Sequence, residues 1–213
     1  MREEFRSELA EVSRTLVAMA ESVCGLMRRA DAALNEADLA GAEAVIDGDA
    51  EVDALFRIVE DRIFALLARQ APVASDLRLV ITALHAAADL ERMGDLAEHV
   101  ARTARRRHPA SAVAPPVTGL FKEMGEIANG MSTKITKALS DHDAVAAAQL
   151  DRDDDAMDDL HRRLFAVMFG PDWNEGVEAA VDTALLGRYY ERYADHAVNV
   201  GQHVVFLVTG ESV

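Results

Sequence analysis

Two short acidic motifs of the same form, Glu-Arg-x-x-Asp, occur in the two halves of this sequence. The first contains Glu91 and Asp95, and the second contains Glu191 and Asp195. On a helix, residues four apart lie on one face with their Cβ atoms roughly 6 Å apart. Paired carboxylates of this kind suit hard cations such as Mg, Ca, Mn or ferric iron. The motifs therefore point to metal binding, with a solvated acidic face as the alternative.

Each motif belongs to a longer set of metal-ligating residue types. The row continues one turn further, to His99 in the first half and Asn199 in the second, and the preceding helix of each half carries aspartates four residues apart. If neighbouring helices pack antiparallel, those aspartates could lie level with the motifs. The ion could be Fe, Mn, Mg, Ca or Zn. The candidate ligands are Glu91, Asp95, His99, Glu191, Asp195, Asn199, Asp49, Asp53, Asp154 and Asp158.

Arginines accompany these carboxylates in two ways. Arg92 and Arg192 directly follow the motif glutamates, but adjacent helical residues do not face each other. We therefore expect both arginines to find partners elsewhere. A basic cluster lies further along the first half; it suggests compensation of a helix dipole or, alternatively, a docking site for an acidic partner. The cluster consists of Arg102, Arg105, Arg106 and Arg107.

Catalytic signatures are missing from the sequence. It contains no glycine-rich phosphate loop and no recognisable nucleophile setting, which favours a non-enzymatic adaptor. A metal-dependent enzyme of the carboxylate-bundle type is one alternative, but such bundles use Glu-x-x-His pairs. The nearest segment here is 158–161, which begins with aspartate. A metal-free helical adaptor is the second alternative.

The composition limits the class of protein. The 213 residues are 50% hydrophobic and carry a formal net charge of −15, with a pI near 4.8. The acidic balance argues against nucleic-acid binding, which needs a basic surface. A single cysteine, Cys24, cannot form an internal disulfide. No run of residues is apolar enough to span a bilayer, so we expect a cytoplasmic protein.

The elements that must position these residues are all helical. Apolar residues recur every three to four positions, and the breaks fall at turn residues, which predicts an all-α protein with six long helices. The expected helices span 3–35, 39–70, 75–107, 118–139, 144–169 and 175–209. The halves align with an offset of 105 residues over two helices and 100 over the third. This duplication predicts two tandem, pseudo-symmetric three-helix bundles, 1–109 and 118–213, with a linker at 110–117.

With these motifs and this duplication, the sequence resembles the PhoU family of phosphate-uptake regulators. The resemblance rests on segments 72–78, 90–95 and 191–200 and covers essentially the whole chain. It implies a cytoplasmic, usually dimeric protein that negatively regulates the phosphate-starvation response. It also implies metal clusters on the acidic motifs, and partners in the ATPase PstB of the phosphate ABC transporter and the sensor histidine kinase PhoR. Two positions depart from the family pattern: His99 replaces Asn or Asp, and Ala194 replaces Gly.

Overall fold

Long helices account for nearly all of the computed structural model, which describes residues 2–70 and 72–210. Within these residues there are six long helices and no strand, which confirms the predicted all-α fold. A single helical turn, α5 (Ala144–Ala147), and a 3-10 turn, η1 (Pro115–Val117), complete the chain. The long helices are α1 (Arg2–Glu36), α2 (Leu39–Gln70), α3 (Ser75–Arg107), α4 (Thr118–Asp141), α6 (Leu150–Met168) and α7 (Gly176–Thr209).

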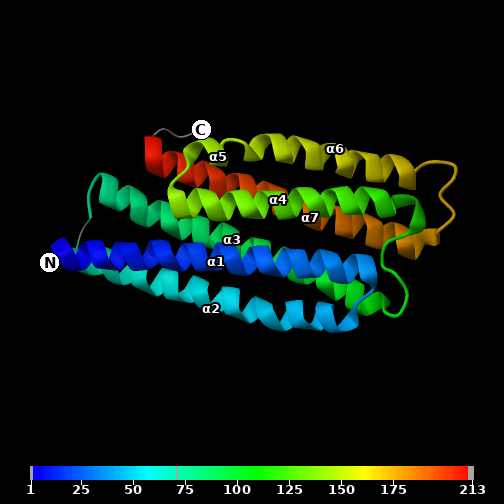
Figure 1. The fold of residues 1–213 in the computed structure, drawn as a ribbon, viewed down its shortest axis with the longest axis horizontal. Coiled ribbons are helices and arrows are strands. Elements are labelled where there is room, and N and C mark those ends of the chain that lie inside the picture. Colours follow the sequence, from blue (N-terminus) through cyan, green and yellow to red (C-terminus); the bar gives the residue numbers. More distant parts are fainter. Residues whose placement is uncertain (1, 71, 211–213) are drawn as a thin grey trace.

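The helices form two three-helix bundles that lie side by side along their length. Figure 1 shows α1, α2 and α3 in one bundle and α4, α6 and α7 in the other. The bundles meet where α3 packs on α7 and α1 packs on α4. Each repeat therefore contributes its first and third helices to the boundary, and the long axes of all six helices run nearly together.

One hydrophobic core runs through both repeats. The equivalent methionines Met19 and Met124 are both fully buried, as are Tyr190 and Tyr193 of α7. Burying a large apolar side chain contributes roughly 1.5–3 kcal/mol. Because the core is continuous across the α3–α7 and α1–α4 boundaries, the two repeats stabilise one another.

The fifth predicted helix is divided in the structure. We predicted one helix over 144–169, but the chain leaves the helix between Ala147 and Leu150. The break lies against Gly201 of α7, where an added Cβ would come within 3.1 Å of the Ala147 carbonyl oxygen. Asp143 caps the short first piece, since its carboxylate accepts 3.0 Å hydrogen bonds from two backbone amides. The close approach of α7 explains a bend that the local sequence does not encode.

The predicted linker, 110–117, is packed against the protein. It is irregular up to Ala114 and then forms η1. Val113, Ala114 and Val117 are buried against the core. The connection between the repeats therefore fixes their relative position.

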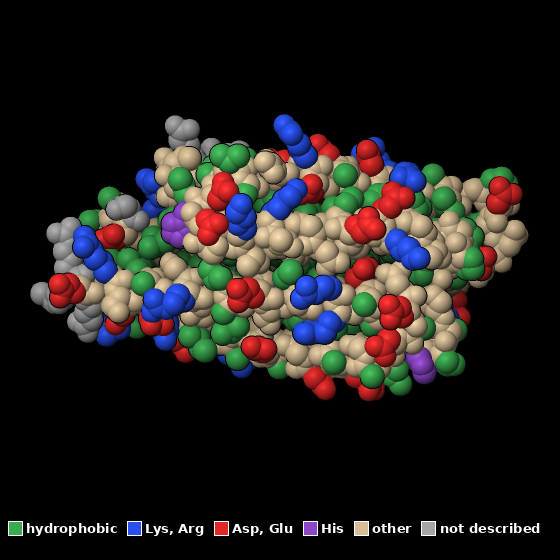
Figure 2. Space-filling view, viewed as in Figure 1, with side chains coloured by type: hydrophobic (Ala, Val, Ile, Leu, Met, Phe, Trp, Pro, Cys, Tyr) green, Lys and Arg blue, Asp and Glu red, His purple; other side chains and the backbone are tan. Residues whose placement is uncertain are grey.

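The surface shown in Figure 2 carries acidic and basic side chains interspersed along the helices. Within residues 2–70 and 72–210, no helix combines the length and the apolarity that crossing a membrane requires.

Candidate functional site

The first acidic cluster forms between α2 and α3, as the antiparallel packing predicts. Asp49 is half-buried, and its pKa is raised to about 6 by burial and then by the neighbouring charges of Glu98, Asp95, Asp53 and Glu91. Burial likewise raises the pKa of Glu91, with Asp95 adding to the effect. The two helices therefore bring the four carboxylates among the candidate ligands of the first half into one repulsive field, which does not include His99.

Gly94 makes room for this cluster. A Cβ at this position would stand 2.8 Å from Oδ1 of Asp49. The second repeat has Ala194 at the equivalent position, where it is fully buried. In the first cluster the Asp49 carboxylate can therefore lie close to the α3 backbone at Gly94. At the equivalent position of the second repeat, the methyl group of Ala194 takes up this space.

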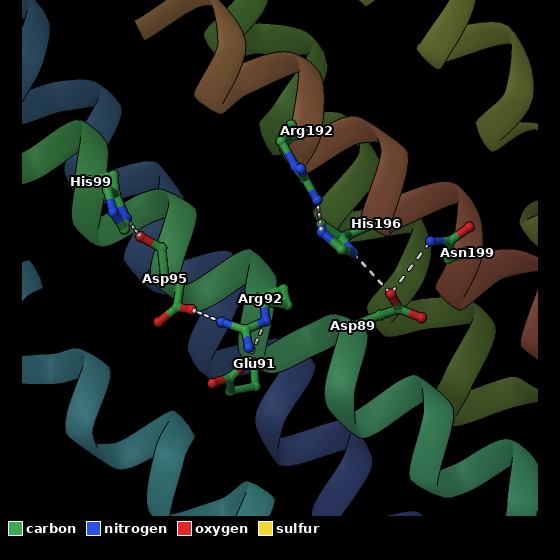
Figure 3. Close-up of polar contacts among 8 residues, drawn as sticks. All are labelled: Asp89, Glu91, Arg92, Asp95, His99, Arg192, His196 and Asn199. Atoms are coloured by element: carbon green, nitrogen blue, oxygen red, sulfur yellow. Dashed lines mark hydrogen bonds and ion pairs between the residues drawn. The ribbon is translucent and has the colours of Figure 1, made fainter. Parts of the chain in front are cut away.

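Arg92 holds the motif together, contrary to the expectation that it pairs elsewhere. Its Nη1 donates a 2.7 Å hydrogen bond to Asp95, and its Nε lies 3.5 Å from Glu91. Figure 3 shows the guanidinium folded back along α3 between the two carboxylates. The prediction was wrong because it considered only the adjacent residue, whereas Asp95, three residues on, lies within reach of a long side chain. Arg192 does pair outside its motif: its Nη2 lies 3.4 Å from Nε2 of His196.

The second acidic cluster lies between α6 and α7. Burial raises the pKa of Asp154 to about 6, followed by the charges of Asp195, Asp158 and Glu191. Arg188 pairs with Glu191 from one turn earlier in α7. Oδ1 of Asp154 is buried and has no hydrogen-bond donor within residues 2–70 and 72–210. A buried carboxylate oxygen without a donor is costly, so this cluster has an unmet need for a proton or a cation.

His99 and Asn199, the third residues of the two acidic rows, lie at the contact between α3 and α7. Four residues on a helix turn about 40° past a full turn, so a row drifts by about 80° over eight residues. His99 donates from Nδ1 to the carbonyl oxygen of Asp95 at 2.5 Å, and its ring lies 5.1 Å from that of Tyr189. Asn199 reaches Asp89 on α3 at 3.4 Å. In this arrangement each contacts the opposite repeat.

Asp89 organises the boundary between α3 and α7, and we did not identify it from the sequence. His196 donates to it from Nδ1 at 2.9 Å, and His203 lies 3.1 Å away through Nε2. Burial alone would raise the pKa of Asp89, but the hydrogen bonds from both histidines outweigh it and lower the pKa to about 2. Figure 3 shows Asp89 pointing to α7, away from Glu91. The available signal was the spacing of His196 and His203, since residues seven apart share a helix face.

Several arginines of the basic cluster at the end of α3 form ion pairs within the protein. Arg106 and Arg107 both pair with Asp182 of α7, which is buried. Arg107 also contacts Glu178 at 2.8 Å, and Arg102 donates to Glu98 at 2.7 Å. Much of this cluster therefore ties the repeats together, a role that neither of the sequence-based interpretations included.

A further polar link joins α1 and α7 beside α4. The Tyr190 hydroxyl donates to Asp31 at 2.8 Å, and Asn35 donates to the same oxygen at 3.2 Å. Burial raises the pKa of Asp31. Gly125 of α4 leaves room for this contact, because a Cβ there would overlap the Asp31 carboxylate unless that side chain shifted. The contact locks the two bundles at a second boundary.

The donor chemistry of both acidic clusters fits a hard cation. All of the converging ligands are carboxylates, and Asp154 has an oxygen that lacks a donor. Within the described residues, however, no three His, Cys, Asp or Glu side chains converge in a ready metal-binding geometry. Arg92 and Arg188 hold motif carboxylates in ion pairs. A cation would therefore compete with these arginines for Asp95 and Glu191.

Comparisons with known proteins are consistent with the duplicated architecture. The family model described as the PhoU domain matches residues 16–104 and 121–204, one match in each repeat. A phosphate-specific transport system accessory protein, PhoU homolog 2 from Mycobacterium tuberculosis, is 47% identical, with 99% of each chain covered. PhoU homolog 1 from Mycobacterium leprae is 45% identical over 99% of this chain and 95% of its own. The crystal structure of PhoU from Pseudomonas aeruginosa superposes with a TM-score of 0.89 at 29% identity, covering 97% of this chain and all of the other.

Proposed function

The chain belongs to the PhoU family, and from that premise we propose that it acts as an accessory protein of phosphate transport. The observation that carries this proposal is the full-length similarity to proteins named as phosphate-specific transport system accessory proteins, at up to 47% identity. Both acidic motifs of the duplicated unit are present. The protein would work by binding partners on its helical faces, without catalysing a reaction.

The finer part of the proposal concerns regulation. We propose that the protein restrains the phosphate-starvation response on the cytoplasmic side of the membrane, as a homodimer. In this role it would contact the ATPase of the phosphate transporter (PstB) and the sensor kinase (PhoR). Two three-helix bundles with charged side chains along their surface offer suitable surfaces for a protein that links two others.

Deleting the gene tests the regulatory role. We expect transcription of phosphate-starvation genes to stay high at high external phosphate, with phosphate uptake no longer restrained. Complementation with the wild-type chain should restore both responses. Normal repression and uptake in the deletion strain would contradict the proposal. Pull-downs against the transporter ATPase and the kinase separate the two proposed partners.

We further propose that the two acidic clusters hold hard metal ions that support partner binding. The support is the pair of raised carboxylate pKa values and the unsatisfied oxygen of Asp154. A bound cation would neutralise charges that otherwise repel one another. In each cluster it would take its oxygens from the motif carboxylates and the aspartates of the preceding helix. The ligands would be Glu91, Asp95, Asp49 and Asp53 in the first cluster, and Glu191, Asp195, Asp154 and Asp158 in the second.

Elemental analysis combined with thermal melting tests the metal proposal. Protein purified without chelator should carry Fe, Mn, Mg, Ca or Zn, and adding the correct ion should stabilise it by about 2.7 kcal/mol at a hundredfold excess over Kd. Asp95→Asn and Asp195→Asn should each lower the metal content. Asp61→Asn is the matched control, since Asp61 is exposed and outside both clusters. Absence of bound metal together with an unchanged melting temperature would favour the metal-free adaptor.

A further inference from the structure

A pocket at the contact between α3 and α7 contains three arginines and is lined by no aliphatic side chain. It has a volume of about 450 Å³ and lies beside the C-terminal part of α3. The chain as a whole carries a net charge of −15, so a hollow with three guanidinium groups stands out from its surroundings. We call it the arginine pocket; its lining residues are His99, Arg102, Thr103, Arg105, Arg106 and Tyr189.

The guanidinium groups of this pocket are only partly occupied. Arg102 uses one terminal nitrogen to contact Glu98, and Arg106 uses one to contact Asp182. Arg105 is exposed and makes no hydrogen bond or ion pair to any residue in 2–70 and 72–210. Several donors of fixed, forked geometry therefore remain available for an anion.

We propose that the arginine pocket binds an oxyanion of the phosphate class, either inorganic phosphate or the phosphate group of an ester. Guanidinium forks match the oxygens of phosphate in pairs and bind it through charge-assisted hydrogen bonds. The pocket wall adds Tyr189, whose ring is braced against that of His99 at 5.1 Å. The hydroxyl of Tyr189 makes no hydrogen bond within the described residues, so it adds a neutral donor.

The lining favours a compact anion over an acidic peptide. Hot spots of protein interfaces are enriched in Trp, Tyr and Arg that lie in fully desolvated pockets, whereas Arg102, Arg105 and Arg106 are exposed here. Here the only large ring is Tyr189, and it already packs on His99. The remaining lining groups are charged or hydrogen-bonding, which suits a small ligand that is dense in charge.

A second hollow extends the site along the α3–α7 contact. It has a volume of about 320 Å³ and shares His99 with the arginine pocket. Its other lining residues are Arg92, Arg192, His196, Asp95 and Leu96, and Arg92 is already paired with Asp95. A linear triphosphate that reached this hollow would meet Arg192 and His196 but also the Asp95 carboxylate, so tripolyphosphate tests whether the second hollow adds to binding.

Isothermal titration calorimetry on the purified full-length protein tests the proposal. Orthophosphate, tripolyphosphate and adenosine monophosphate are titrated separately, with chelator present to remove metal-mediated binding. Wild-type protein should bind at least one of them, and the affinity should fall as salt rises. Orthophosphate binding identifies free phosphate as the ligand, whereas binding of the monophosphate alone identifies an ester.

Two arginine substitutions make the test specific. Arg105→Gln should weaken binding by about tenfold or more, which corresponds to the loss of one charge-assisted hydrogen bond. It should melt like wild type, because Arg105 has no partner to lose among the described residues. Arg28→Gln is the control: Arg28 is an exposed arginine of α1 without an ion pair to any described residue, it does not line the pocket, and its replacement should leave binding unchanged.

Three results would overturn the proposal. The first is no binding of any phosphate compound by the wild-type protein. The second is equal binding by wild type and the Arg105→Gln variant. The third is binding of a poly-glutamate peptide alone, which would make the pocket a protein-docking site. Because the assay uses purified protein only, its outcome is independent of the deletion phenotype that tests the proposed function.

Discussion

The contact between α3 and α7 has two ends that use equivalent positions with different residues. At one end His99 of α3 packs on Tyr189 of α7. At the other, Asn199 of α7 contacts Asp89 of α3, where two histidines also bind. Since the repeats are offset by 100 residues here, the two contacts are related by pseudo-symmetry. The two ends of the α3–α7 contact therefore share the same helix packing but differ in the side chains that make the contact.

This difference shows how a duplicated protein can become asymmetric without changing its backbone. One end opens into the arginine pocket and is rich in cations. The other end is centred on a single carboxylate that holds side chains from the second repeat. The two acidic clusters differ less. In the first repeat Gly94 lies against Asp49, and in the second repeat the equivalent position is Ala194. Comparing matched substitutions in the two repeats can therefore separate inherited from acquired interactions.

The largest expected effect is at the carboxylate end of the contact. Asp89→Ala should destabilise the protein by about 2–3 kcal/mol, because it removes charge-assisted hydrogen bonds in a mostly buried site. At the aromatic end, His99→Ala should cost only about 1 kcal/mol, for one ring contact and one hydrogen bond. Urea unfolding at pH 7 measures both. Asp61→Ala, at an exposed carboxylate, should stay within about 0.5 kcal/mol of wild type, and equal losses at the two ends would refute the asymmetry.

The next effect concerns a position that is alanine in the first repeat and glycine in the second. Ala20 is buried without difficulty, whereas a Cβ at Gly125 would strike the Asp31 carboxylate that Tyr190 holds. Gly125→Ala should therefore cost about 1–2 kcal/mol. In the same helix, Gly130→Ala meets no atom within 4 Å and should gain up to about 1 kcal/mol from helix propensity. Thermal melting compares the two, and a gain at both glycines would show that Asp31 moves aside freely.

Exchanging the motif residues at 94 and 194 should have a smaller effect. Ala194→Gly should cost about 1 kcal/mol, since glycine weakens a helix interior. Gly94→Ala should be close to neutral, because the same helix gain is offset by displacing Asp49. Chemical unfolding measures stability, and NMR titration of Asp49 shows whether its pKa moves. A clear gain at 94 with an unmoved pKa would mean that the glycine is not needed by the cluster.

The smallest expected effect is the pH dependence of the two clusters. Asp49 and Asp154 both have pKa values raised to about 6 from an ordinary value of 3.8. The folded state therefore binds more protons than the unfolded state between these values, and stability falls as pH rises from about 4 to 6. In metal-free protein, Asp49→Asn and Asp154→Asn should each stabilise the fold at pH 7 by less than about 1 kcal/mol, given solvent screening.

The same variants should show no gain below about pH 4, where the wild-type carboxylates are protonated. Thermal melts at pH 4 and pH 7, with chelator present, measure the difference. Because the pKa values are alike, the two variants should behave alike. A gain in only one of them would show that the clusters carry different charges.

Most of the fold could be predicted from the sequence because its signals are local. Apolar spacing, Pro72 and Gly210 place the ends of most helices within one or two residues of those observed. The break between α5 and α6 could not be predicted. Its residues, including Ala147 and Ala148, favour a helix, and the interruption depends on how closely Gly201 approaches from α7.

The candidate site also contains one part that could be predicted from the sequence and another that could not. Four-residue spacing is a property of one helix, so the placement of Glu91 with Asp95 followed from the sequence. The contacts of Asp89 with His196 and of Arg106 with Asp182 join residues far apart in the chain. They depend on the packing of one repeat against the other, for which a single sequence holds no local signal. The antiparallel pairing of α2 with α3 lies between these cases, since a short connection makes it the natural choice.

The symmetric pairing of α3 with α7 has a consequence for the origin of the chain. Positions 99 and 199 meet 189 and 89, so each repeat presents the same surface to the other. A contact of this kind is isologous, as between subunits related by a two-fold axis. An ancestor with a single three-helix unit could bury this surface only by pairing with a second copy of itself. Fusion of two such genes would let the equivalent positions change independently, and in the present sequence positions 99 and 199, and positions 89 and 189, differ.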